Sequence, residues 1–383
     1  NTRRNITSVG YRNFSYASGP TTTPISPFSA FEQCIGNTPL LYLKSASRIA
    51  GCNIYAKAEF MNPGGSVKDR AALWMVREAQ KSGELIRNEP GIIVEGTAGN
   101  TGIGLALVSQ VFGYECVIVI ARTQTPEKKD CLRQAGAKLI EVDAVPYRDD
   151  NHYTKIAERL AANLKATSGK RVLYANQWDN LANQRAHIQG TGPEIWQQTN
   201  GRVNVFSCAV GTGGTLSGVG KYLRMVSNND ENIKICLTDP KGAALYHYFV
   251  NGELKADGSS ISEGIGQGRI TGQLEGFRPD YAIEVDDRDM MNVIHALQET
   301  DGLMVGLSSG INVAGAIQVA HDLKLKSEDT VVTMLCDLSV RYITKQFNKP
   351  FLESKNLPSP PWYDEQAALK DERLMEAVNK SFV

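Results

Sequence analysis

The sequence lacks several features that mark common classes of protein. Its seven cysteines are odd in number and scattered, with no C-x-x-C pair, which favours free thiols in a reducing compartment over a disulfide framework. Its five histidines pair with no cysteine or carboxylate at a metal-ligand spacing, so no metal site is predicted. No stretch approaches ~18 uninterrupted apolar residues, so we expect no membrane-spanning helix.

The chain also lacks a net charge. Its 41 Lys and Arg residues balance 41 Asp and Glu residues, so no overall field attracts nucleic acid, an anionic membrane or another highly charged macromolecule. With 383 residues and 42% hydrophobic content, the chain can bury a full core and has the length of two domains. A small molecule is therefore the expected kind of partner.

Acidic residues are missing from the amino end. Residues 1–31 contain three arginines and many serines and threonines, and the first acidic residue is Glu32. This composition is typical of a mitochondrial presequence. A polar, disordered arm over residues 1–27 is the alternative interpretation. We therefore expect a mitochondrial protein, with a cytoplasmic location as the alternative.

Short β-branched runs alternate with helix-like stretches along the rest of the chain. The expected strands are 53–59, 91–96, 116–121, 138–142, 203–210, 233–239 and 330–336. The expected helices include 68–83, 101–113, 154–169 and 215–227. This alternation predicts an α/β fold with parallel sheets and helices on both faces. In such sheets the ligand lies beyond the carboxyl ends of the strands, so the loops that follow the strands are where chemistry is expected.

The first of these loops, residues 62–70, reads NPGGSVKDR. Ser66 is a natural N-cap, and Asp69 three residues later completes a capping-box pattern, so a helix is predicted to begin at Val67. Lys68 then lies in the first turn, where the helix dipole disfavours an ammonium group. A lysine in this position is either an ordinary surface residue or a functional amine.

Three further loops lead into helices through small residues. Residues 95–102 offer free backbone N–H groups and two threonine hydroxyls, which suit a carboxylate. Residues 211–215 are glycine-rich but lack the lysine of a Walker A loop, and Leu216 stands where a dinucleotide fingerprint needs glycine, which leaves the phosphate of a smaller cofactor. Residues 306–310 contain two serines. Taken singly, the loops at 95–102 and 306–310 also fit plain helix caps.

Together these segments resemble the motifs of cysteine synthases. The similar segments are 62–70, 95–105 (EGTAGNTGIGL), 191–196 (TGPEIW), 211–215 (GTGGT), 263–268 (EGIGQG) and 306–310 (GLSSG). Cysteine synthases, or O-acetylserine sulfhydrylases, belong to the β-family (fold type II) of pyridoxal-phosphate enzymes, which includes cystathionine β-synthase. The resemblance implies a tryptophan synthase β-like α/β fold with two domains. Each domain would have a mostly parallel twisted sheet flanked by helices, and the cofactor would lie in the cleft between them.

The resemblance also implies how the chain is divided and what it binds. A smaller, mobile domain would comprise 60–180, and a larger one 28–59 plus 181–348. Residues 349–383 would form a C-terminal extension. The expected assembly is a homodimer, the expected substrates are O-acetylserine and sulfide, and serine acetyltransferase is a candidate partner.

Single residues receive roles from the same resemblance. Lys68 would bond covalently to pyridoxal 5'-phosphate and move the α-proton of the substrate. Asn100 would bond to the ring oxygen of the cofactor, and Ser308 would meet its pyridine nitrogen. The cofactor phosphate would be held by Gly211, Thr212, Gly213, Gly214 and Thr215. The substrate carboxylate would be bound by Thr97, Gly99, Thr101 and Gln177, with Gly264 on the opposite wall.

The implied reaction is a β-replacement, in which acetate leaves O-acetylserine and sulfide takes its place on the same carbon. The sequence departs from the commonest family pattern at three places. Ala98 stands where serine is frequent, Gly96 where proline is frequent, and residues 336–342 read CDLSVRY where a GERY-like sequence is usual. The first departure removes a hydroxyl from the substrate loop and leaves the identity of the amino acid open.

Two alternative functions remain. A cystathionine β-synthase-type enzyme would condense serine with homocysteine on a similar site. A non-catalytic relative would use the cleft to bind a partner protein. The second alternative is disfavoured because Lys68, Asn100 and Ser308 are all present.

Overall fold

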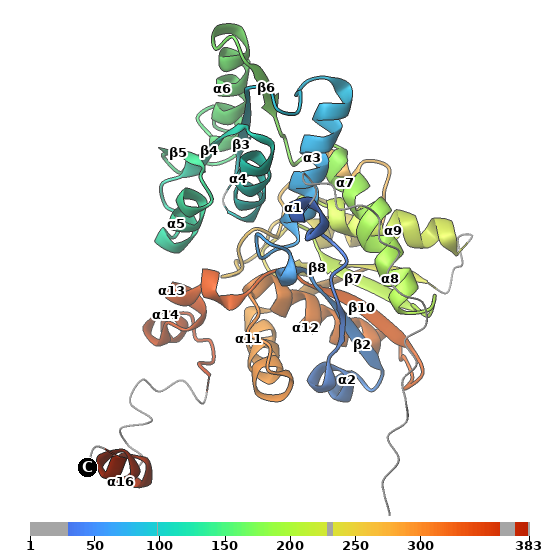
Figure 1. Ribbon diagram of the computed structural model, residues 1–383. Helices are drawn as coiled ribbons and strands as arrows, with labels where there is room; N and C mark the ends of the chain where they lie inside the picture. The colour runs from blue at the N-terminus through green and yellow to red at the C-terminus, as the bar shows by residue number, and fades with distance from the viewer. Residues whose placement is uncertain (1–29, 98, 228–232, 361–371, 382–383) are drawn as a thin grey trace, which may run out of the picture.

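Two separate sheets organise the chain in the computed structural model, which describes residues 30–97, 99–227, 233–360 and 372–381 (Figure 1). The six-stranded sheet contains, in order across the sheet, β1 (Leu40–Tyr42), β2 (Asn53–Ala58), β10 (Thr330–Leu335), β7 (Val205–Ala209), β8 (Lys234–Pro240) and β9 (Tyr281–Val285). The four-stranded sheet contains β5 (Lys138–Val142), β4 (Glu115–Ala121), β3 (Gly91–Gly96) and β6 (Arg171–Tyr174). Neighbouring strands run parallel except β1 and β2.

Helices cover both sheets. Up to β7 they are α1 (Ala30–Gln33), α2 (Lys44–Ala50), the 3₁₀ turn η1 (Glu59–Met61), α3 (Lys68–Ser82), α4 (Asn100–Phe112), α5 (Pro126–Gln134), α6 (Tyr153–Thr167), α7 (Ala182–Ala186), the π-helical η2 (His187–Thr191) and α8 (Gly192–Gln198). After β7 they are α9 (Gly214–Val226), α10 (Leu245–Asn251), η3 (Gly272–Leu274), α11 (Asp287–Ala296), the π-helical η4 (Leu297–Asp301), α12 (Leu307–Asp322), η5 (Ser339–Arg341), α13 (Ile343–Gln346), α14 (Lys349–Ser354) and α16 (Glu372–Ser381). Within the described ranges, no helix combines the length and the apolar character needed to cross a bilayer.

The predicted α/β fold with mostly parallel sheets is confirmed. Each of the seven predicted strands is present, and α3, α4, α6 and α9 coincide with the predicted helices to within one or two residues. The prediction missed β1, β6 and β9, which are short and lie at the edges of their sheets. Such edge strands are partly exposed, so they lack the continuous apolar run that marks a buried parallel strand.

Apolar clusters on both faces hold the sheets. The six-stranded sheet packs on one face against α2, α11 and α12, and on the other against α8, α9 and α10. The four-stranded sheet packs against α3 and α4 on one face and α6 on the other. Figure 1 shows the four-stranded sheet with α4, α5 and α6 set apart from the six-stranded sheet, with α3 alongside the four-stranded sheet. The exact domain boundaries, 60–180 and 28–59 plus 181–348, stay a prediction.

Two predicted segments lie partly or wholly outside the described residues. The arm at 1–27 is outside them entirely. Of the C-terminal segment 349–383, the structure describes α14, whose Leu352 joins the core of the six-stranded sheet, and α16. Leu352 therefore ties the start of the extension to the larger sheet.

Candidate active site

Loops that follow four parallel strands meet around one cavity of about 510 Å³. Thr97 follows β3, Gln177 follows β6, Thr212 follows β7 and Cys336 follows β10. The cavity therefore lies where the carboxyl ends of parallel strands place a ligand site. The predicted site residues that line it are Lys68, Thr97, Gly99, Asn100, Thr101, Gln177, Thr212, Gly264 and Ser308. The predicted residues Gly211, Gly213, Gly214 and Thr215 flank Thr212 in the turn behind it.

Lys68 is the first residue of α3, and its half-buried side chain lines the cavity. Its backbone N–H donates to Oγ of Ser66 at 3.3 Å, which satisfies one free donor of the helix start. The helix begins one residue after the predicted Val67, and the predicted capping box is wrong. Asp69 instead accepts the backbone N–H of Gly64 at 2.5 Å, because the turn before the helix folds back over this carboxylate. Burial raises the pKa of Asp69 to about 7.

The predicted substrate loop leads into α4. The helix begins at Asn100, and Gly99 at the N-cap position provides no side-chain cap, so the first backbone N–H groups have no partner within the helix. The hydroxyl of Thr101 donates to Oε1 of Gln177 at 2.5 Å, which joins the loops after β3 and β6. Ala98, the departure from the family pattern, lies outside the described residues.

The glycine turn after β7 has the donors that a phosphate requires. Gly213 has φ of 95°, a left-handed conformation that favours glycine, and α9 begins directly after it. The hydroxyl of Thr212 accepts a hydrogen bond from Nδ2 of Asn183 at 2.8 Å, and Oγ1 of Thr215 lies 3.2 Å from Nε2 of His187. N–H groups at the start of α9 that have no helical partner, together with these hydroxyls, could hold an anion.

Close packing explains why the same turn needs glycine at other positions. A Cβ atom on Gly211 would lie 2.4 Å from the carbonyl oxygen of Gly264. A Cβ on Gly214 would lie 2.3 Å from Oδ1 of Asn183. The turn is thus pressed directly against its neighbours, and any side chain there would displace it.

Ser308 lies in the first turn of α12 and lines the cavity. The interpretation of its serine pair as plain helix caps is wrong, because Gly306 takes the N-cap position and no side chain caps the helix. Oγ of Ser309 instead accepts the backbone N–H of Cys336 at 2.9 Å. Burial raises the pKa of the Cys336 thiol to about 11, so this end of the cavity presents neutral groups beside Ser308.

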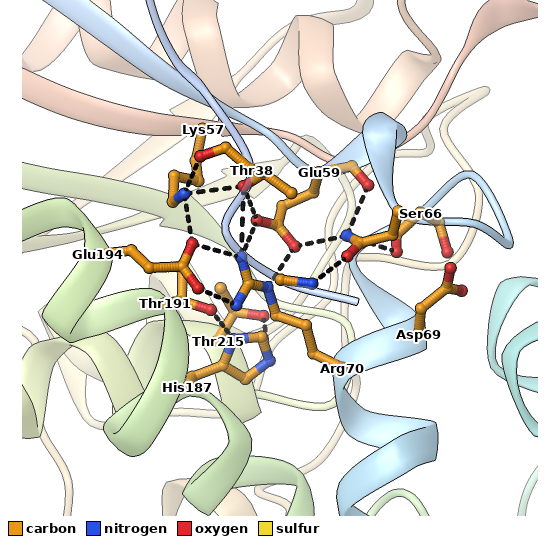
Figure 2. Close-up of polar contacts among 12 residues, drawn as sticks. Thr38, Lys57, Glu59, Ser66, Asp69, Arg70, His187, Thr191, Glu194 and Thr215 are labelled. Atoms are coloured by element: carbon orange, nitrogen blue, oxygen red, sulfur yellow. Dashed lines mark hydrogen bonds and ion pairs between the residues drawn. The ribbon is translucent and has the colours of Figure 1, made fainter. Parts of the chain in front are cut away.

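A buried ionic cluster fixes α3 close to Lys68. Figure 2 shows the guanidinium of Arg70 between Glu59 and Glu194, with hydrogen bonds of 2.7 to 2.8 Å to both carboxylates. Lys57 donates to Glu194 and to the backbone oxygen of Thr38, each at 2.5 Å. Burial alone raises the pKa of Glu194, but the bonds and charges of Arg70 and Lys57 bring it down to about 2. The carboxylate is therefore ionised, and the TGPEIW motif that contains it serves to anchor the lysine helix.

The cluster adjoins the glycine turn after β7 through a buried histidine. His187 has Nδ1 2.9 Å from Oγ1 of Thr191 and Nε2 3.2 Å from Oγ1 of Thr215 (Figure 2). Burial, with the nearby charge of Arg70, lowers the pKa of His187 to about 3. The ring is therefore neutral, and it links the π-helical turn η2 to the start of α9.

Sequence reasoning missed part of the cavity wall. The additional polar and aromatic lining residues are Gln124, Lys128, Tyr147, His152, Tyr153, Thr154, Trp178, Glu263, Gln267, Arg269 and Tyr342. Gln124 and Tyr147 come shortly after β4 and β5, so the rule that sites follow strands would have found them. Lys128 and Glu263, which both line the cavity, form an ion pair. No local sequence pattern predicts that contact.

Comparison with known proteins decides the family. A family model described as "Pyridoxal-phosphate dependent enzyme" matches residues 31–337. The chain belongs to this family. The resemblance inferred from the motifs is thereby confirmed, and the protein is a pyridoxal-phosphate dependent enzyme. The residues of the cavity fit that cofactor, because the amine of Lys68, the donors at the start of α9 and the hydroxyl of Ser308 line or border one space.

Relatives and solved structures agree with this assignment. The chain is 47% identical over 327 residues to "Cysteine synthase 1" of Neurospora crassa, covering 84% of each chain. It is 44% identical over 354 residues to "Cysteine synthase 1" of Emericella nidulans, covering 90% of this chain and 92% of the relative. A relative in Saccharomyces cerevisiae, "Putative mitochondrial cysteine synthase", is 38% identical over 83% of this chain and 84% of its own. The crystal structure of O-ureido-L-serine synthase matches with a TM-score of 0.71 and 29% identity, covering 83% of this chain and 95% of that one.

Proposed function

We propose that this protein is a cysteine synthase, which exchanges the acetate of O-acetylserine for sulfide and releases cysteine. The observation that carries the proposal is the placement of Lys68 in one cavity with the helix start at Asn100 and the hydroxyl of Ser308. The cysteine synthases of Neurospora crassa and Emericella nidulans, similar over most of both chains, support the same reaction.

The cofactor and the amine of Lys68 would have different tasks in the reaction. Bound pyridoxal phosphate supplies an electron-withdrawing ring, which acidifies the α-proton of an attached amino acid and lets a β-substituent leave. Lys68 would hold the cofactor, and its Nζ would then take the α-proton and later return it. Arg70, two residues on and locked to Glu59 and Glu194, keeps the helix that carries this amine in place.

The substrate carboxylate would bind at the start of α4. Free N–H groups and the positive end of the helix dipole favour an anion there. The hydroxyl hydrogen of Thr101, which bonds to Gln177 in the structure, would be available to an arriving carboxylate. The substrate would thus exchange one hydrogen bond for another and bring its α-carbon toward Lys68.

A visible spectrum of the purified protein tests the proposal. We expect an absorbance band of the lysine-bound cofactor, a shift on addition of O-acetylserine, and reversal of the shift by sulfide with formation of cysteine. Lys68→Ala should lose the band and the activity, whereas Lys81→Ala, at an exposed lysine on the same helix, should keep both. Product formation from serine and homocysteine, with no response to O-acetylserine, would instead establish the condensation reaction. A cofactor band without turnover of either pair would favour a binding protein.

Location and assembly are further parts of the proposal. The Arg-rich, acid-free residues 1–31 and the yeast relative named as mitochondrial support a mitochondrial protein. Fusion of these residues to a fluorescent protein tests this, and a diffuse cytoplasmic signal would contradict it.

We also propose a homodimer that binds serine acetyltransferase. Sedimentation of the protein alone and with that enzyme measures both associations.

A further inference from the structure

The side-chain amide of Asn100 is held by two charged residues from the segment after β10. Its Nδ2 donates to Oδ2 of Asp337 at 2.8 Å, and its Oδ1 accepts from Nη1 of Arg341. Arginine can only donate, and an ionised carboxylate can only accept. The two partners therefore determine which end of the amide is oxygen and which is nitrogen, a choice that geometry alone does not settle.

Both partners are themselves fixed. Asp337 is fully buried and also accepts the hydroxyl of Tyr342 at 2.6 Å. Arg341 donates through Nη2 to the backbone oxygen of Gly64, in the turn that precedes Lys68. The backbone N–H of Val67 donates to the oxygen of Cys336 at 3.0 Å. The lysine loop, the amide and the segment after β10 thus form one frame across the two sheets.

The remaining hydrogen of the amide has a defined direction. An asparagine nitrogen carries two hydrogens, and Asp337 takes one of them. Because the amide is planar and both of its polar atoms are held, the second N–H cannot rotate independently. Asn100 lines the cavity, so this hydrogen is the polar group that the residue can offer to a bound ring.

We propose that Asp337 and Arg341 are positioning residues, which fix the Asn100 amide so that its second N–H faces the ring of the cofactor. The proposal rests on the cofactor of the family and on the role proposed for Asn100, and it is independent of which amino acid is converted. The proposal also assigns a role to the segment CDLSVRY (336–342), because Asp337 and Arg341 both belong to it.

A double-mutant cycle on cofactor affinity tests the inference. Apoprotein would be titrated with pyridoxal 5'-phosphate, and the dissociation constant read from absorbance, for wild type, Asp337→Asn, Asn100→Ala and the double variant. An asparagine at 337 can donate or accept, so Arg341 alone then holds the Asn100 amide in its orientation. We expect each single variant to bind roughly 2- to 10-fold more weakly, the range of one hydrogen bond. In the Asn100→Ala background, Asp337→Asn should weaken binding by less than about twofold.

Two outcomes would overturn the proposal: unchanged affinity in Asp337→Asn, or the same loss with and without Asn100. Because the readout is binding, failure of the cysteine synthase assignment would leave it intact. Arg341→Gln provides a second route if Asp337→Asn does not fold, since glutamine can donate or accept and leaves Asp337 alone to hold the amide. The loss of cofactor affinity caused by Arg341→Gln should likewise disappear in the Asn100→Ala background. Arg288→Gln is the matched control, because Arg288 also donates to a backbone oxygen, that of Asn356, whereas Arg341 donates to Asn100 as well.

Discussion

At the scale of single residues, burial gives Glu95 an unusual protonation. Glu95 is the last residue but one of β3, two residues before Thr97, and its side chain is fully buried. Desolvation raises its pKa from 4.5 to about 8. In the folded protein this group therefore keeps its proton at neutral pH, whereas in the unfolded chain it loses the proton near pH 4.5.

This difference predicts a pH dependence of stability. Between about pH 4.5 and 8 the folded state binds one more proton at Glu95 than the unfolded state, so the free energy of unfolding falls as the pH rises. Glu95→Gln cannot titrate. The free energy of unfolding of this variant, relative to that of wild type, should therefore rise by on the order of 4 kcal/mol between pH 4.5 and 8. Urea denaturation at several pH values measures this, with Glu328→Gln as the control for loss of an exposed carboxylate. A constant difference across the range would mean that folded Glu95 is ionised.

The sequence was sufficient to propose Lys68, Asn100 and Ser308 as site residues because their motifs are local. It could not give the partners of Asn100, since Asp337 and Arg341 lie more than two hundred positions away and meet it only when the two sheets assemble. Local rules also misassigned some contacts. Asp69 fitted a capping box, yet a buried backbone N–H from the preceding turn binds it instead.

At the scale of elements, α3 depends on one guanidinium. Removing Arg70 would leave the carboxylate of Glu59, which is fully buried, without its cationic partner. Arg70→Met should therefore lower the free energy of unfolding by about 3 to 5 kcal/mol. Arg77→Met removes an exposed arginine from the same helix, paired with Glu32, and should cost less than about 1 kcal/mol.

Chemical denaturation of both variants measures these costs. Adding Glu59→Gln to Arg70→Met should recover part of the stability, because the uncompensated charge is then removed. Equal costs for Arg70→Met and Arg77→Met would show that the buried cluster is not what holds α3.

The central helix α12 depends on small residues instead. A Cβ on Gly315 would lie 2.2 Å from Cγ2 of Thr238 on β8. Alanine is favoured over glycine in a helix by about 1 kcal/mol, but overpacking costs about 1 to 3 kcal/mol. At so short a distance we expect the cost of overpacking to exceed the gain in helix propensity, so Gly315→Ala should lower the melting temperature. Adding Thr238→Ser, which removes the clashing methyl group, should restore part of the loss. Simple additivity of the two changes would show that this contact is not the cause.

The burial of each element explains which strands and helices the hydrophobic pattern of the sequence could predict. The strong alternation of buried strands and helices was readable because each element carries its own apolar pattern. The strands β1 and β6 were not, because three or four residues are too few to show a strand pattern of their own. Helix α12 is buried along nearly its whole length, so its boundaries follow from its neighbours and not from a polar face.

At the scale of the whole molecule, one carboxylate joins the parts that carry the two sheets. Glu263 forms ion pairs with Lys128 on α5 and with Lys345 on α13. Lys128 is well buried, and burial lowers its pKa to about 8. Its ammonium also lies 5.2 Å from the ring centre of Tyr342. Since α5 packs beside the four-stranded sheet and α13 follows β10, Glu263 links the two parts from the wall of the cavity.

We propose that residues 60–180 move as a unit and that this bridge holds them near the rest of the chain. Glu263→Gln would leave Lys128 without its carboxylate, so α5 should open more often. Because Lys128 is well buried but Glu263 is partly exposed, we expect a cost of about 1 to 2 kcal/mol, or roughly 5- to 30-fold faster hydrogen exchange in α5. Exchange in β7 and β8 should stay close to wild type, whereas a uniform rise everywhere would indicate global destabilisation. Glu253→Gln, at an exposed carboxylate, controls for the charge change. Unchanged exchange in α5 would show that other contacts hold the two parts together and that the ion pair serves the cavity alone.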